Sequence, residues 1–283
     1  YKKIIKLGKK DLNLLNQNET EKFFKKYKPE YVINAAARVG GILANSKFKA
    51  NFIYENLMIQ TNIIHSSFKV GVKKLIFLGS SCIYPKSCKQ PIKEEYLLTG
   101  KLEETNDAYA ISKIAGLKMC EAYNKQYNLD YLCLMPTNLY GPNDNYDLEN
   151  SHFFPALLKK ILLAKKNNSN HLVIWGNGKA KRELMYVDDL ASACEFFLKK
   201  KTKHSLINIG SGEEKTITDF AKFILKKLKI KLKIKYDKLK PNGTHRKVVD
   251  MKVANSYGWR PKYSLKKGFD LTIKDFLLKN NLI

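Results

Sequence analysis

Short apolar runs alternate along the chain with longer segments in which apolar residues recur at helical spacing. The runs predicted to be strands are residues 31–37, 74–80, 131–137, 172–175 and 207–210. The segments predicted to be helices are residues 51–70, 107–127, 153–166 and 187–200. Strands that alternate with helices form parallel sheets joined by crossover helices. The sequence therefore predicts an α/β protein, and its 283 residues with 44% hydrophobic content can bury an ordinary core.

Beyond about residue 142 the predicted elements become shorter and more mixed. They include a helix that opens near Thr216, a lysine-rich strand at residues 231–236 and a closing helix at about 264–279. We expect a sheet domain at residues 1–142 and a smaller lobe, partly interleaved with it, at residues 143–283. Residues 226–240 are rich in lysine, and lysine discourages pairing at a sheet edge. We therefore expect this segment to form an exposed helix end and an edge strand.

The charge of the chain is strongly positive. It carries 52 Lys and Arg against 26 Asp and Glu, a formal net charge of +26, which attracts polyanions at low salt. The lysines are spread over every predicted helix, and no arginine- and aromatic-rich recognition segment accompanies them. Solvated surface lysines therefore explain the charge better than a nucleic-acid surface does. The positive charge would also attract a substrate that carries a nucleotide diphosphate.

The cysteines and the apolar segments indicate the compartment. Cys82, Cys88, Cys120, Cys133 and Cys194 contain no C-x-x-C pair, so neither a disulfide framework nor a zinc site is expected. No window reaches the eighteen apolar residues of a membrane span, and the first residues do not resemble a secretory signal. We therefore expect a cytoplasmic protein with reduced thiols, no metal and no membrane association.

Polar, turn-forming residues follow three of the predicted strands, at residues 38–41, 81–85 and 138–142. In an open parallel sheet, ligands bind at the carboxyl ends of the strands. In the first of these clusters, Gly40 and Gly41 allow the backbone to approach a ligand closely. We therefore expect the functional site where these three clusters meet.

Tyr109 and Lys113 lie four residues apart in a predicted helix, which places the phenol and the ammonium on one face. A nearby ammonium favours phenolate and is expected to lower the pKa of Tyr109, which makes this residue a candidate acid or base for a carbonyl. Ser80, at an upstream strand end, is placed to hydrogen-bond the same carbonyl. A tyrosine and lysine at this spacing occur by chance in many lysine-rich chains, so the serine strengthens the prediction.

Several segments spread along the chain match the signature segments of one enzyme family. They are AAARVGGILAN (35–45), GSSCIYP (79–85), YAISKIAG (109–116), MPTNLYGPNDNYD (135–147), SHFFPALLKK (151–160), VIWGNGKAKRELMYVDDLA (173–191), NIGSGEEKTI (208–217) and KPNGTHRKVVDMKVANSYGW (240–259). In these segments the chain resembles the GDP-L-fucose synthases, which are extended short-chain dehydrogenase/reductases. The resemblance implies a Rossmann-type doubly wound parallel sheet at residues 1–142, which binds NADP, and a smaller C-terminal α/β substrate lobe.

The resemblance also implies an activity. Members of this family epimerise C3 and C5 of GDP-4-keto-6-deoxy-D-mannose and then reduce its C4 ketone with NADPH. By resemblance, Cys82 is the base and His152 the acid for the epimerisation, and both types of side chain can exchange protons near neutral pH. Ser80 and Tyr109 are expected to polarise the C4 oxygen, and Tyr109 to protonate it after hydride transfer.

The same resemblance assigns the binding residues. The residues expected to bind the cofactor, NADP(H), are Leu78, Gly79, Ser80, Ser81, Lys113, Pro136, Thr137, Asn138, Leu139 and His152. The residues expected to bind the GDP-sugar are Lys160, Trp175, Arg182 and Asp250. Lys9 and Lys10 follow a predicted strand at residues 4–7 and are placed to meet the 2′-phosphate of NADP. The helices at 51–70 and 107–127 resemble those through which the family forms homodimers.

One family feature is missing from this sequence. Family members begin with a strand and a G-x-x-G-x-x-G turn whose amides hold the cofactor pyrophosphate, and no such turn occurs here. We expect the sequence to be a piece of a longer protein that carries this turn, and the chain as it stands to bind NADPH weakly and to have low stability. Two alternatives remain open: another nucleotide-sugar epimerase or dehydratase, which would not need the Cys82 and His152 pair, and a non-catalytic nucleotide- or RNA-binding relative.

Overall fold

The computed structural model describes residues 3–148, 151–240 and 243–279. One of its two four-stranded sheets, called the large sheet here, is parallel throughout. The strands lie in the order β1 (Tyr31–Asn34), β2 (Lys74–Leu78), β3 (Tyr131–Pro136) and β7 (Leu206–Ile209). All four coincide with apolar runs predicted to be strands. The prediction of a Rossmann-type parallel sheet is thus confirmed.

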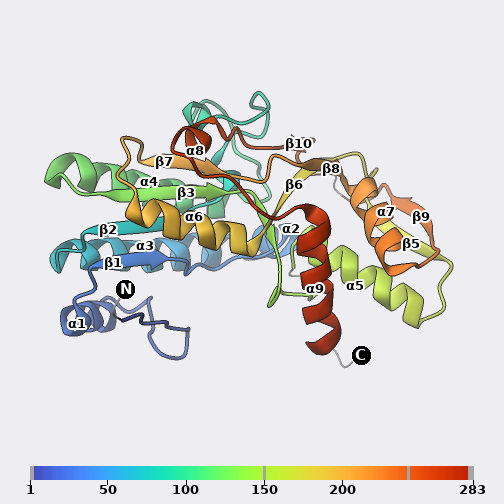
Figure 1. Cartoon of the computed structure of the whole chain (residues 1–283), viewed down its shortest axis with the longest axis horizontal. Helices are drawn as coiled ribbons and strands as arrows, with labels where there is room; N and C mark the ends of the chain where they lie inside the picture. Colours follow the sequence, from blue (N-terminus) through green and yellow to red (C-terminus); the bar gives the residue numbers. More distant parts are fainter. Residues whose placement is uncertain (1–2, 149–150, 241–242, 280–283) are drawn as a thin grey trace.

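Helices cover both faces of this sheet (Figure 1). They are α3 (Lys49–Lys69) and α4 (Asp107–Tyr127) on one face and α6 (Val187–Lys199) on the other. Leu75 and Phe77 of β2 pack in the core beside α3 and α4, whereas Ile76 packs in the core that contains Phe197 of α6. Burial on both faces explains why the strands read as continuous apolar runs.

The first part of the chain differs from the prediction. Residues 4–7 form no strand, and Ile4 is 82% exposed, so the expected position of Lys9 and Lys10 after a strand is wrong. A strand requires a neighbour for its backbone hydrogen bonds, and no described residues pair with this segment. The first helix, α1 (Gln17–Tyr27), was not predicted; the side chain of Asn16 caps it by accepting from the Glu19 amide.

Smaller sheets form the rest of the molecule. In one of them β4 (Asn138–Tyr140), β6 (Lys181–Tyr186) and β10 (Arg246–Lys247) are parallel, and β8 (Glu214–Thr216) is antiparallel to β6. The other pairs β5 (His171–Trp175) with β9 (Lys233–Asp237). The helices beside them are α5 (Phe153–Lys166), α7 (Ile217–Leu228) and α9 (Leu265–Lys279), which share a core built on Phe154, Phe220 and Phe269.

Short elements complete the described chain. They are α2 (Ile42–Lys47), α8 (Lys252–Ser256) and two 3-10 turns, η1 (Ser81–Ile83) and η2 (Glu94–Tyr96). Strand β7 and the helices α6 and α8 come from the second half of the chain but contribute to the cores of the large sheet. The two halves of the sequence therefore share one structural framework.

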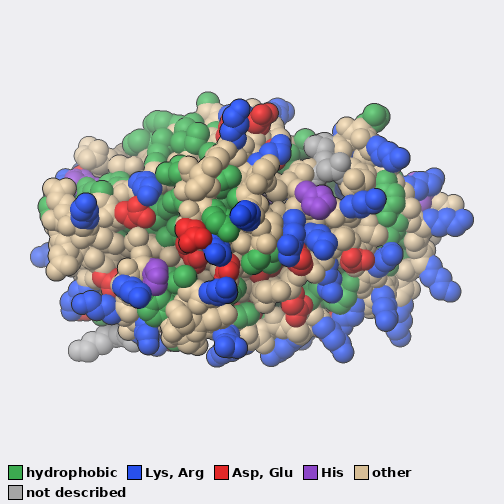
Figure 2. Space-filling view, turned by 90° about the horizontal axis from the view of Figure 1, so that it is seen from above, with side chains coloured by type: hydrophobic (Ala, Val, Ile, Leu, Met, Phe, Trp, Pro, Cys, Tyr) green, Lys and Arg blue, Asp and Glu red, His purple; other side chains and the backbone are tan. Residues whose placement is uncertain are grey.

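The surface and the described helices bear on the possible partners. Figure 2 shows lysine and arginine side chains scattered over the visible face, with acidic side chains between them. Among the described residues, no helix is both long enough and apolar enough to cross a membrane. The described residues also contain no group of three or more His, Cys, Asp or Glu side chains arranged to hold a metal ion.

Candidate active site

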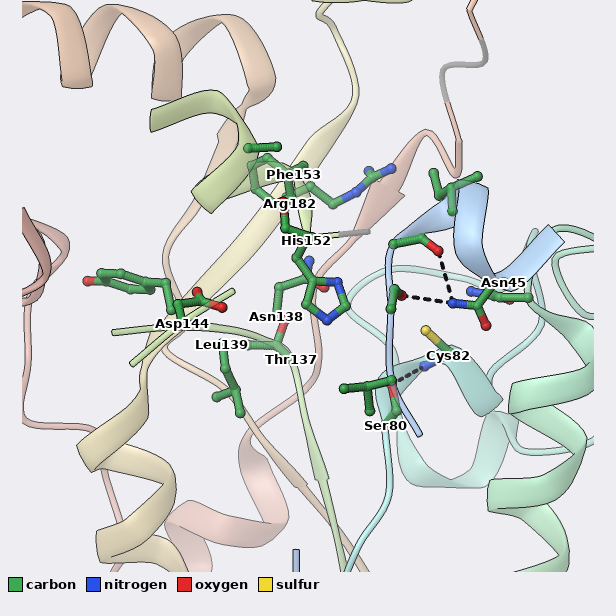
Figure 3. Close-up of a pocket in the computed structure, with 18 of the residues that line it drawn as sticks. Asn45, Ser80, Cys82, Thr137, Asn138, Leu139, Asp144, His152, Phe153 and Arg182 are labelled. Carbon is green, nitrogen blue, oxygen red and sulfur yellow. Dashed lines mark hydrogen bonds between the residues drawn. The ribbon is translucent and has the colours of Figure 1, made fainter. Parts of the chain in front are cut away.

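A cavity of about 580 Å³ lies at the carboxyl ends of β1, β2 and β3, where the three polar clusters meet. The side chains of β5, β6 and α5 form its other side. Figure 3 shows Ser80, Cys82, Asn138, His152 and Arg182 arranged around it. The volume is typical of a pocket for a small molecule.

The loop after β1 is held by one amide side chain. The Asn45 amide nitrogen donates to the carbonyl oxygens of Gly40 (2.8 Å) and Gly41 (3.0 Å), as Figure 3 shows. The Oδ1 atom of Asn45 is buried at the cavity and has no hydrogen-bond partner among the described residues. Because buried acceptors normally have partners, this atom fits a donor supplied by a bound ligand.

Helix α4 presents Tyr109 and Lys113 to the cavity from successive turns. The Lys113 ammonium donates to the carbonyl oxygen of Leu78 at 2.9 Å, at the end of β2. Burial lowers the pKa of Lys113 to about 8. This lysine therefore titrates close to physiological pH, and its ammonium is fixed at a strand end.

The expected direction of the Tyr109 pKa shift is wrong. Burial of the phenol raises its pKa, the neighbouring Cys82 thiolate adds to the rise, and a hydrogen bond with Ser80 only partly opposes it. The Lys113 nitrogen lies 5.9 Å from the centre of the Tyr109 ring, and this ammonium is already bound to a carbonyl oxygen. Tyr109 is therefore a protonated phenol at neutral pH, which suits it to donate a proton.

Cys82 lies in the 3-10 turn η1 directly after the end of β2. Its amide donates to the Ser80 hydroxyl at 3.2 Å, and its sulfur accepts from the Lys247 ammonium at 3.1 Å. Burial opposes ionisation of the thiol, but the charge of Lys247, hydrogen bonds from Ser80 and Lys247, and the charge of Arg182 lower its pKa overall. A thiol with a lowered pKa can act as a base.

His152 lies at the N-terminus of α5, and its side chain caps no backbone group there. The ring points into the cavity that Cys82 also faces (Figure 3). Burial lowers the pKa of the imidazole, and the nearby Lys247 lowers it further. Cys82, Tyr109 and His152 are thus brought to one cavity, as their proposed chemistry requires.

Most residues expected to bind the cofactor line this cavity. They are Leu78, Gly79, Ser80, Lys113, Pro136, Thr137, Asn138, Leu139 and His152. Ser81 is placed differently, because its side chain is buried beside a much smaller neighbouring cavity. Its role in binding the cofactor remains a prediction.

The residues expected to bind the GDP-sugar divide in the same way. Lys160, Trp175 and Arg182 line the cavity, and the Lys160 ammonium lies 4.5 Å from the centre of the Trp175 ring. Asp250 is nearly buried outside the set of residues that line the cavity, and its carboxylate accepts from the Lys252 amide at 2.8 Å. Substrate binding by these four residues remains a prediction.

Sequence reasoning gave no role to several polar residues at the cavity, among them Asn45, Asp144 and Lys247. Asp144 is labelled in Figure 3, and burial raises the pKa of its carboxyl to about 6. Lys247 stands three residues before Asp250 in a segment that was recognised, but a single lysine in a lysine-rich chain carries little signal. Asn45 closes another recognised segment, and only the structure shows its unpaired oxygen.

A parallel sheet with these groups at its strand ends defines a dinucleotide-dependent enzyme acting on a carbonyl or an alcohol. The chain belongs to the NAD dependent epimerase/dehydratase family, whose pattern matches residues 4–210. More particularly, it is similar to GDP-L-fucose synthase 1 of Arabidopsis thaliana, with 51% identity over 270 residues, 95% of this chain and 83% of that protein.

Solved structures agree with this assignment. A GDP-L-fucose synthetase from Naegleria fowleri bound to NADP superimposes with a TM-score of 0.90 at 28% identity, over 98% of this chain and 86% of that one. A GDP-mannoheptose C4 reductase from Campylobacter jejuni with NADP bound has a TM-score of 0.86 at 36% identity, over 96% and 89% of the two chains. Both proteins use the fold described above.

Proposed function

We propose that this chain is an NADPH-dependent enzyme that converts GDP-4-keto-6-deoxy-D-mannose to GDP-L-fucose. It epimerises C3 and C5 and then reduces the C4 ketone. The observation that carries the proposal is the convergence of Cys82, Tyr109 and His152 on one cavity at the ends of the parallel strands. The similarity to named GDP-L-fucose synthases supports the same substrate.

In the epimerisation, the Cys82 thiolate removes a proton from the carbon beside the ketone. The electron pair of the broken C–H bond moves into the carbonyl and forms an enolate, whose oxygen Tyr109 and Ser80 stabilise by hydrogen bonds. His152 returns a proton to the opposite face of the carbon, so the centre is inverted. Proton exchange with solvent then restores the thiolate and the imidazolium for the second centre.

NADPH, when bound, would supply the hydride for reduction at C4. Tyr109 donates its phenolic proton to the oxygen, which becomes the hydroxyl of the product. Its raised pKa keeps this proton in place until charge develops on the oxygen. The Lys113 ammonium is held by the Leu78 carbonyl and is placed to bind the ribose hydroxyls of the cofactor.

The cationic side of the cavity is proposed to bind the GDP group. The Trp175 ring offers a flat face to the guanine base, and the Lys160 and Arg182 side chains pair with phosphate oxygens. Asp250 is retained as a proposed binding residue. The cofactor residues named above are proposed to hold NADP(H), and the unpaired Oδ1 atom of Asn45 supports a ligand with a hydrogen-bond donor beside them.

The test is a reaction in deuterated water with NADPH and the 4-keto sugar. The proposal requires oxidation of NADPH and a GDP-L-fucose product that carries deuterium at both C3 and C5, which mass spectrometry and NMR detect. Tight retention of RNA with no change in nicotinamide absorbance would instead support the non-catalytic alternative.

A reductase without epimerase activity is the second candidate, favoured by the similarity to the Campylobacter jejuni C4 reductase. It would consume NADPH and leave no deuterium on the sugar ring. The same experiment therefore separates the two candidates.

We further propose a homodimer formed through α3 and α4, which pack against each other and expose Tyr54 (60%) and Ile111 (47%). Light scattering at several concentrations tests this assembly. We also propose that residues 1–142 bind the cofactor and residues 143–283 mainly the substrate. The predicted cytoplasmic location remains part of this proposal.

A further inference from the structure

Lys247 is directed at the cavity by the alternation of side chains along β10. This strand pairs in parallel with β6, so that Lys247 lies opposite Arg182 and Arg246 lies opposite Lys181. The Arg246 guanidinium forms hydrogen bonds of 2.7–3.1 Å with the Glu214 carboxylate. Since successive side chains of a strand point to opposite sides, Lys247 points away from this ion pair and toward the Cys82 sulfur.

The backbone that follows Lys247 is held by two segments, residues 90–92 and strand β6. The Val248 amide donates to the Gln90 side chain at 3.1 Å, and the Asp250 amide donates to the Ile92 carbonyl at 2.7 Å. Between them, the Val249 amide donates to the buried Glu183 carboxylate at 3.0 Å. Three consecutive anchored amides fix the position from which the lysine side chain extends.

Several other charged or titratable groups face the Cys82 sulfur. Arg182 lies on the neighbouring strand, but its guanidinium donates to the carbonyl oxygens of Thr244 (2.6 Å) and Lys181 (2.8 Å). The Glu103 carboxylate acts on this guanidinium, and Glu103, Tyr109 and His152 also line the cavity. The Lys247 ammonium, at 3.1 Å, is therefore the cation in direct contact with the sulfur.

We propose that Lys247 is a positioning residue for the epimerisation: its ammonium holds the Cys82 sulfur as a thiolate directed into the cavity. Its part in the epimerisation rests on the proposed function; its effect on the thiol does not. In the step itself, the sulfur gains the proton of the substrate carbon and becomes a thiol, while the electron pair enters the enolate. Lys247 exchanges no proton.

The electrostatic effects of Lys247 support this role and make it testable. The lysine lowers the pKa of Cys82 against the opposing effect of burial, and it adds to the lowering of the His152 pKa that burial causes. Removal of the charge is therefore expected to raise both values. A residue with only a structural role would not move both in the same direction.

The direct experiment measures the alkylation of Cys82 by iodoacetamide as a function of pH. Digestion with trypsin separates Cys82, in the peptide of residues 75–86, from Cys88, in residues 87–89, so each thiol is followed by mass spectrometry. The variants are Lys247→Met, which removes the charge, and Lys247→Arg, which keeps it. Lys181→Met is the control, because it removes a lysine on the paired strand that does not face the cavity.

In Lys247→Met, the apparent pKa of Cys82 is expected to rise, so that alkylation at neutral pH slows about ten-fold or more, as expected for the loss of a contacting opposite charge. Lys247→Arg should restore most of the rate, and Lys181→Met should leave it unchanged. In Lys247→Met, the rate of deuterium incorporation into the 4-keto sugar should also fall, with little change in KM. The plot of this rate against pH should move to higher pH on both its acidic and its basic side.

An unchanged alkylation profile in a folded Lys247→Met protein, as judged by circular dichroism, would overturn the proposal. Failure of the proposed function has a different signature. In that case the Cys82 profile shifts as expected, which supports the effect of Lys247 on the thiol, but the unmodified protein incorporates no deuterium, which overturns the role in epimerisation.

Discussion

The two sides of the cavity shift the pKa values of nearby side chains in different ways. The sheet wall, formed by Ser80, Tyr109 and Lys113, lies against the core of the large sheet. There burial raises the pKa of the tyrosine and lowers that of the lysine, so both shifts favour the neutral forms. The cationic wall, formed by Lys160, Arg182 and Lys247, lines the other side. Burial opposes ionisation of Cys82, but Lys247 and Arg182 of this wall help to lower its pKa overall.

This contrast assigns different chemistry to the two walls. Reduction of a ketone needs a proton donor that stays protonated until the hydride arrives, which the sheet wall provides. Removal of a proton from carbon needs a base, and the lowered pKa of Cys82 beside the cationic wall suits it to this proposed role. One cavity can therefore hold an acid and a base with opposite pKa shifts, because each responds to its own surroundings.

The largest expected effect comes from Tyr109→Phe on the sheet wall. Loss of the proton donor should lower the rate of ketone reduction about 10²- to 10⁴-fold. NADPH binding, followed by nicotinamide fluorescence, should be retained because the ring and the Lys113 contact remain. Reduction at nearly the original rate would show that the sheet wall does not supply the proton.

Cys82→Ser tests the base that the cationic wall acts on. We expect a loss of rate as large as that in Tyr109→Phe at most, but in the epimerisation instead of the reduction. Deuterium incorporation at C3 and C5 should fall about 10²- to 10⁴-fold, since a serine hydroxyl is not ionised at neutral pH. Reduction of the unepimerised ketone should continue, giving a different GDP-sugar that NMR identifies. Equal loss of both steps would contradict the separation of the walls.

Arg182→Met should weaken substrate binding with a smaller effect. Loss of hydrogen bonds from a charged group to the diphosphate costs about 1.5–3 kcal/mol, which raises KM for the GDP-sugar roughly ten- to hundred-fold. KM for NADPH should stay unchanged, and this second constant is the internal control. A rise in both values would mean that Arg182 serves the cofactor instead.

The pH dependence should also differ between the two steps. Reduction should decrease as pH rises above about 8, where Lys113 loses its charge. Deuterium exchange should decrease as pH falls through the lowered pKa of Cys82, because the thiol is then protonated and cannot act as the base. It should also decrease as pH rises through the lowered pKa of His152, because the imidazole must be protonated to act as the acid. Identical profiles for the two reactions would contradict the contrast.

The smallest expected effect concerns the packing beneath the sheet wall. A Cβ atom at Gly116 of α4 would lie 2.6 Å from the Phe77 ring and 2.8 Å from the Gln60 side chain. In Gly116→Ala, overpacking of about 1–3 kcal/mol is partly offset by about 1 kcal/mol of helix propensity, so urea should unfold the variant at a slightly lower concentration. Lys118→Ala, at an exposed position of the same helix, should show no comparable loss.

The regular elements of the sheet domain could be predicted from sequence because their cores impose a strong pattern. Helix α4 was predicted with its observed ends, and strands such as β2 and β3 are apolar on both faces. The short strands β6, β8 and β10 were not predicted, since their polar residues reflect the cavity and the ion pairs they serve. Residues 4–7 show the opposite error: an apolar run without a partner strand is not a strand.

The candidate site was predictable where chemistry and sequence spacing coincide, as for Tyr109 and Lys113. It was not predictable where distant segments meet. Lys247 contacts Cys82 across 165 positions of the chain, and the pairing of β10 with β6 and the contacts of residues 248–250 with Gln90 and Ile92 bring them together. The direction of the Tyr109 shift was also beyond the sequence, because spacing reveals a neighbouring ammonium but not the extent of burial.

The buried Glu183 carboxylate has a consequence for how new specificities can arise. It accepts from the main-chain amides of Gly212 and Val249, so it connects backbone segments rather than the side chains that line the cavity. Directed evolution can therefore vary the side chains of β6 and β10 while this attachment survives. The acceptance of a different sugar can change on that scaffold without rebuilding the apparatus for hydride transfer.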